Sequence, residues 1–215
     1  MIKATAANIV VIPSQQVNPS VFHQLWLLEH GVFTKAELDS ALNAVFLPVF
    51  VSVPTSVMDV LVMGERVQFT SKTPQEWHTG AFQERFSKFM DASRIAVSSI
   101  GFNWSYQITA DGDPVRFLER ARQTLLPSAI PWADAFLAGS SHIGSFLNRA
   151  IDDGSQQIDV RQSGPENSDA PFVACNFNFH FPVTNTEAAL KKMEVAKTYY
   201  ELARDQAYSL NSALA

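Results

Sequence analysis

The sequence has little charge, a single cysteine and no long apolar run. Charged residues make up 17% of the 215 residues, against about 25% in a typical soluble domain, so much of the surface must be neutral. The lone cysteine, Cys175, cannot form an internal disulfide, and nothing indicates an oxidising compartment. No stretch approaches the ~18 apolar residues of a membrane span, and the run Ile9 to Ile12 is too short for a signal peptide core. We therefore expect a soluble, cytoplasmic chain without a membrane segment.

Clustered basic residues and glycine-rich phosphate loops are missing as well. The chain has 16 Lys and Arg against 21 Asp and Glu, a net charge of −5, and its basic residues are scattered. Binding to a phosphate backbone relies on clustered cations, so we expect no nucleic acid partner. The nine glycines form neither a phosphate loop nor a dinucleotide fingerprint. We expect no cofactor.

Hydrophobic periodicity predicts one α+β domain over residues 1–215, because a chain of this length fits a single core. Helices are expected over 21–30, within 34–44, around the phenylalanines of 82–89, from 114 to 125, and over 185–214. Strands are expected over 6–12, 48–53, 57–63, 66–71, 95–109, 156–162 and 172–183. Short connections such as Gly64-Glu65 predict antiparallel hairpins. The fold class is therefore an antiparallel sheet with one apolar face covered by helices, and a long C-terminal helix.

The strands 95–109 and 172–183 alternate strictly between apolar and polar residues. Their apolar members are expected to form one core: Phe102, Trp104, Tyr106, Phe177, Phe179 and Phe181. Their polar members are the candidate ligand-binding residues: Asn103, Ser105, Gln107, Asn176, Asn178 and His180. If the strands are neighbours, these side chains line one surface for a neutral ligand, with His180 as the acid–base group. The other interpretation is a face that is merely solvated, as one face of an antiparallel sheet often is.

The C-terminal helix over 185–214 carries the most regular pattern. Thr184 and Glu187 have capping-box spacing, and no proline or glycine follows. Small and large apolar residues recur every four and three positions on one seam, and a helix from 186 to 213 would be about 42 Å long at ~1.5 Å per residue. We expect the seam to mediate self-association or binding of a protein partner, through Ala196, Tyr200, Ala203, Ala207 and Leu210. The competing explanation is that it covers the chain's own sheet.

The spacing of the histidines and the cysteine argues against a metal site and against a reactive thiol. His23 and His30 lie seven residues apart on one predicted helix, about 10.5 Å along its axis, too far to share an ion. Cys175 and His180 have odd spacing, so their side chains are expected on opposite faces of a strand. No metal site is expected.

Two other motifs resemble catalytic ones only superficially. Ser141 stands in Gly139-Ser140-Ser141-His142, but the next glycine, Gly144, is one position too late for a nucleophile elbow. Asp111 and Asp113 flank Gly112 before a proline, where a turn and a helix cap explain them. No catalytic residue is assigned.

The segments 99–108 (SIGFNWSYQI) and 176–183 (NFNFHFPV), with the helix after them, resemble a sporadically distributed bacterial protein family of unknown function. The resemblance covers mainly the second half of the chain. It implies a bacterial, intracellular origin and carries no catalytic residue.

These observations favour a non-enzymatic interaction or assembly protein that acts as a homo-oligomer or as a subunit of a larger bacterial complex. The alternative is a ligand-binding or enzymatic domain that uses the polar face of the sheet. A deep pocket on that face would favour the alternative, and a flat solvated face would favour the first.

Overall fold

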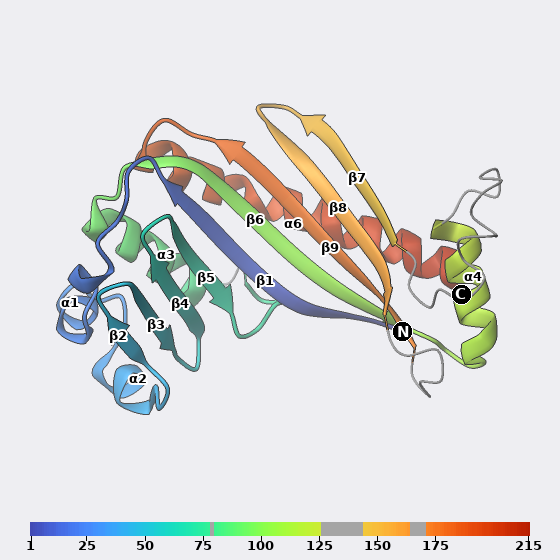
Figure 1. Ribbon diagram of the computed structural model, residues 1–215, viewed down its shortest axis with the longest axis horizontal. Coiled ribbons are helices and arrows are strands. Elements are labelled where there is room, and N and C mark those ends of the chain that lie inside the picture. Colours follow the sequence, from blue (N-terminus) through green and yellow to red (C-terminus); the bar gives the residue numbers. More distant parts are fainter. Residues whose placement is uncertain (78–79, 126–143, 164–170) are drawn as a thin grey trace.

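The computed structural model describes residues 1–77, 80–125, 144–163 and 171–215. Within these residues the strands form one sheet of nine, in the order β2-β3-β4-β5-β1-β6-β9-β8-β7, and every neighbouring pair is antiparallel. Figure 1 shows α3 and α6 passing behind this sheet, and no helix of the described residues lies in front of it. The expected α+β class is confirmed. Ser141 and most of the predicted loop 163–169 lie outside the described residues.

The bounds of the elements follow the hydrophobic pattern closely. The strands are β1 Ile2–Pro13, β2 Val45–Leu47, β3 Phe50–Pro54, β4 Met58–Met63, β5 Arg66–Ser71, β6 Val97–Thr109, β7 Gly144–Ile151, β8 Gly154–Ser163 and β9 Phe172–Pro182. The helices are the 3₁₀ turn η1 Pro19–Val21, α1 Gln24–Glu29, α2 Lys35–Ser40, α3 Gly80–Ser93, α4 Pro114–Leu125 and α6 Thr186–Leu214. The two edge strands, β2 and β7, are not predicted by the hydrophobic pattern.

The helix predicted over 21–30 is wrong at its start. Asn18 caps a separate 3₁₀ turn by accepting from the backbone of Ser20, and α1 begins only after His23, whose ring accepts from the backbone N–H of Trp26. The short helix α2 is confirmed, with a complete capping box between Thr34 and Glu37. Side-chain caps therefore divide this segment in two.

The core lies between the sheet and the helices. The N-terminal strand β1 sits between β5 and β6, so the chain's two halves share one continuous sheet. The six aromatic residues expected in the core are all buried there: Phe102, Trp104, Tyr106, Phe177, Phe179 and Phe181. That prediction is confirmed. The aromatic rings of β6 and β9 pack against α6, where the ring centre of Tyr200 lies 5.9 Å from that of Trp104.

The predicted interface on α6 needs correction. Ala196, Ala203 and Ala207 are fully buried within the chain, Tyr200 is 8% exposed, and Leu210 packs against the same core. This seam covers the chain's own sheet, because α6 crosses β1, β6 and β9. It is therefore core, and any partner would have to meet other faces of the helix.

The start of α6 also differs from the prediction. Asn185 rather than Thr184 caps the helix, by accepting from the backbone N–H of Ala188 at 2.8 Å. The hydroxyl of Thr186 donates to the carbonyl of Ile95 at 2.7 Å, which ties the helix to the segment before β6. Within the described part of the chain, no helix combines the length and the apolar character that crossing a membrane requires.

Candidate functional site

The six polar residues singled out in the sequence do lie together, on the face of the sheet that the described helices leave uncovered. We call it the open face. Strands β6 and β9 are direct neighbours, and their register pairs Gly101 with His180, Asn103 with Asn178, and Ser105 with Asn176. Gln107 continues the same face opposite Ala174. The condition for a shared surface, adjacency of the two strands, is therefore met.

A row of side-chain amides crosses the open face from the central strand β1 to the edge strand β7. The registers of five neighbouring strands align Asn8, Asn103, Asn178, Gln157 and Asn148. The Nδ2 of Asn103 donates to the Oδ1 of Asn8 at 2.8 Å. We call these five residues the amide row. Three of its members were not predicted from the sequence, because local periodicity does not show which strands are neighbours.

His180 lies on the open face, where its paired neighbours in the described strands offer no charged partner. In the paired strands it stands opposite Gly101 and Ser155, neither of which is acidic or basic. A general acid or base normally has an orienting group within hydrogen-bond reach, and this register supplies only a serine. Among the described residues, no three His, Cys, Asp or Glu side chains are placed to hold a metal ion.

The other candidate side chains have structural roles. Cys175 is fully buried on the opposite face from the exposed His180, and burial raises the pKa of its thiol to about 12. His30 hydrogen-bonds the carbonyl of Trp26 at 2.9 Å and stacks on the same indole. Asp113 caps α4 by accepting from the N–H of Val115 at 2.9 Å, as expected.

The edge strand β7 is the least covered strand of the sheet. Phe146 is 64% exposed and Leu147 is 58% exposed, and these neighbours point to opposite faces. In addition to its backbone pairing with β8, β7 contacts the domain through Arg149, whose Nε donates to the Oε1 of Gln156 at 2.7 Å. Gln156 is fully buried and donates in turn to Gln206 of α6 at 2.6 Å.

An apolar cavity of about 390 Å³ lies behind this edge, between the sheet, α4 and α6. Leu147 of β7 forms part of its wall. The other lining residues are Thr124, Leu125, Ser145, Ile158, Val160, Phe177, Gln206 and Leu210. The apolar surface of the edge therefore continues inward, beneath β7 and β8.

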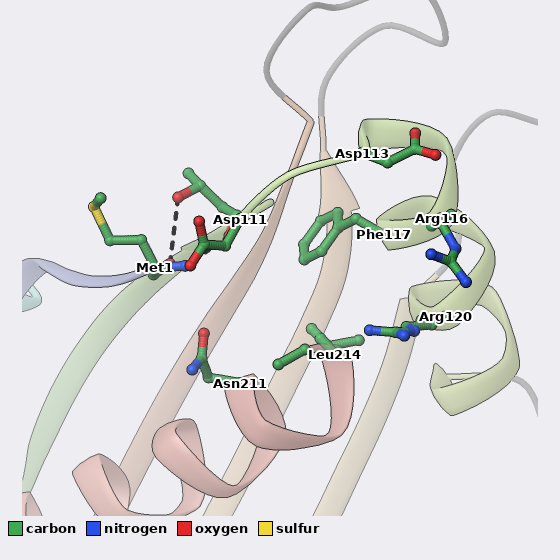
Figure 2. A pocket seen from close by; sticks show the side chains of 10 residues that line it. Met1, Asp111, Asp113, Arg116, Phe117, Arg120, Asn211 and Leu214 are labelled. Carbon is green, nitrogen blue, oxygen red and sulfur yellow. Dashed lines mark hydrogen bonds between the residues drawn. The ribbon is translucent and has the colours of Figure 1, made fainter.

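A second, polar pocket of about 310 Å³ lies where the chain enters α4. Figure 2 shows Phe117 and Leu214 within it, with Asp111 on one side and Arg116 and Arg120 on the other. Both arginines are exposed, and acidic and basic groups share the wall. Such mixed charge selects no single class of ligand. Neither this pocket nor the apolar cavity has any of the six candidate ligand-binding residues in its wall.

Comparisons with known proteins add no activity to this geometry. No protein-family model matches the chain, and a search of curated proteins found no match. Function is therefore inferred from the open face, the amide row and the edge strand β7.

Proposed function

We propose that this chain is a non-enzymatic interaction or assembly protein, which acts as a homo-oligomer or as a subunit of a larger bacterial complex. One observation carries the proposal: nine strands present a face that no described helix covers, and a row of neutral amides crosses five of these strands. Side-chain amides both donate and accept hydrogen bonds, so they can pair with another protein's backbone or side chains without a charge to desolvate.

The composition of the surface supports the same function. Charged residues make up only 17% of the chain, and depletion of charge is the compositional mark of interface cores. Large apolar side chains are exposed at both edges of the sheet, including Phe146 on β7 and Leu47 on β2. A cytoplasmic location fits the single buried cysteine, and we include it in the proposal.

The native mass of the chain in extracts of its own cells tests this function. At its natural abundance the chain should elute well above the 23.8 kDa of one copy. Ser105→Arg, which places a long charged side chain at the centre of the open face, should reduce that mass. Val195→Arg is the matched control, because Val195 lies on α6 and is 45% exposed. Elution of the wild type at the mass of one copy would contradict the proposal.

A ligand-binding function of the open face is the second candidate, and the alignment of amides around His180 is the observation that favours it. Thermal-shift screening against metabolites tests it, because a ligand that binds only the folded state raises the melting temperature. His180→Ala combined with Asn178→Ala should then abolish the shift while the melting temperature of the free protein barely changes. A ligand whose shift survives the double substitution binds elsewhere.

A further inference from the structure

The two edges of the sheet are protected very differently. An edge strand exposes unpaired backbone N–H and C=O groups, and natural proteins block such edges with short strands, prolines, charges or bulges. β2 has only three residues, Val45–Leu47. β7 has eight, contains no proline, and pairs with β8 without a register shift. No strand among the described residues pairs with its outer side.

The one charge on β7 does not block its edge. Arg149 turns its Nε inward to Gln156, so this part of the guanidinium is engaged within the domain. Phe146 and Leu147 meanwhile leave apolar surface on both faces of the strand. Leu147 also borders the apolar cavity that continues beneath β8. The edge combines backbone groups that no other described strand pairs with and exposed apolar side chains, which is the combination that favours strand addition.

We propose that β7 pairs antiparallel with β7 of a second copy of this chain, so that two nine-stranded sheets become one. This inference rests on the proposed assembly function and adds to the open face a second contact, at the edge of the sheet, with a named partner. A two-fold axis perpendicular to the sheet relates the copies, and such an isologous contact closes on itself as a dimer. The axis keeps the two open faces on the same side of the joined sheet.

Faces and charge together select the register. Side chains that pair directly must lie on the same face, so the axis must pass at a residue and not between two residues. Leu147 and Asn148 are the two central residues of β7, and an axis at either one pairs most of the strand. With the axis at Asn148, the two Arg149 positions are offset by two residues, about 7 Å along the strands. With the axis at Leu147, the offset is four residues, about 14 Å. The second register keeps like charges apart and places Leu147 against its copy beside the two apolar cavities.

The size of this contact predicts a dimer of modest affinity. Seven paired residues span about 24 Å at ~3.4 Å each, and a sheet with one helix layer is roughly 20 Å deep. The projected area is therefore about 480 Å² per copy, or about 960 Å² in total, close to the ~1,000 Å² that specific interfaces normally reach. Dimerisation should depend on concentration.

Light scattering and sedimentation of the purified full chain over a wide concentration range test the inference. The wild type should move from the 23.8 kDa of one copy towards twice that mass as concentration rises. Leu147→Lys should remain at the mass of one copy, because it places two ammonium groups against each other at the axis. Leu47→Lys is the matched control on the other edge, where Leu47 is 45% exposed, and it should dimerise like the wild type.

Engineered cysteines test the register. Leu147→Cys should form a disulfide-linked dimer under mild oxidation, since directly opposed Cβ atoms lie about 4.5–5.5 Å apart. Asn148→Cys should not, because its copy is then a diagonal neighbour, about 7–8 Å away. The native Cys175 is buried and will not compete.

A wild type that stays at one copy's mass at every concentration would overturn the inference. So would a dimer that Leu147→Lys leaves intact, or one that links through Asn148→Cys instead of Leu147→Cys. None of these results touches the assembly function itself, which is judged by the native mass in cell extracts and by Ser105→Arg.

Discussion

The two faces of the sheet are built from alternate residues of the same strands, yet their environments are opposite. On β9, Phe179 is fully buried beneath α6, whereas its neighbours Asn178 and His180 lie on the open face. One face excludes water through packed rings, and the other keeps its amides accessible. The comparison teaches that one strand can supply both the packed core and an accessible polar surface, because its side chains alternate between the two faces.

The largest expected effect comes from placing a charge in the covered face. Ala203→Glu puts a carboxylate at a fully buried position of α6 that has no cation beside it in the seam. An uncompensated buried charge with overpacking should cost about 5 kcal/mol or more, comparable with the whole stability of a domain. Circular dichroism should show an unfolded or barely folded chain. Val195→Glu, on the exposed side of the same helix, should fold normally. An Ala203→Glu variant that folds but has a lower native mass than the wild type would show that the seam is an interface between chains.

Truncating the aromatic layer should have the next largest effect. Phe179→Ala removes a fully buried ring whose centre lies 5.5 Å from the ring centre of Trp104 and 5.4 Å from that of Tyr199. The expected loss in the free energy of unfolding is about 3–5 kcal/mol. Denaturant titration measures it, with Asn176→Ala on the open face of the same strand as the control. A loss under about 1 kcal/mol would place Phe179 outside the core.

A smaller effect is expected where the covered face is polar. Gln156→Ala removes the link between Arg149 of β7 and Gln206 of α6 and leaves polar groups unsatisfied. The free energy of unfolding should fall by about 1–3 kcal/mol. The neighbouring Gln157→Ala, on the open face, should cost under about 0.5 kcal/mol. Equal costs for the two substitutions, measured by urea denaturation, would show that the faces do not differ here.

The smallest effect is expected on the open face itself. Asn178→Ala and His180→Ala together remove side chains that make no described hydrogen bond, so each should change the free energy of unfolding by less than about 0.5 kcal/mol. Differential scanning calorimetry should show nearly the same melting temperature as the wild type. A loss of several kcal/mol would mean that this face stabilises the fold rather than serving as a surface.

Much of this architecture could be predicted from local pattern. The alternation in β6 and β9 placed six rings in the core and six polar residues on the other face, since side chains of a strand alternate. The edge strand β7 was missed because Phe146 and Leu147 are adjacent and break that alternation. Asp153-Gly154, a turn signal between two runs, was the available clue to its hairpin. Gly154 is needed at this turn, since a Cβ there would collide with the backbone of His180 and the ring of Phe181.

The sequence by itself determined the period of each element, its burial pattern and the helix-covered α+β class, because these depend on residues close together in the chain. Only the tertiary structure decided which strands are neighbours. Asn8 and Asn103 form one hydrogen bond across 95 residues, and no local signal records such a pairing. The same holds for the seam of α6: its spacing shows that one side is buried, but only the position of the sheet shows that the chain buries that side against itself.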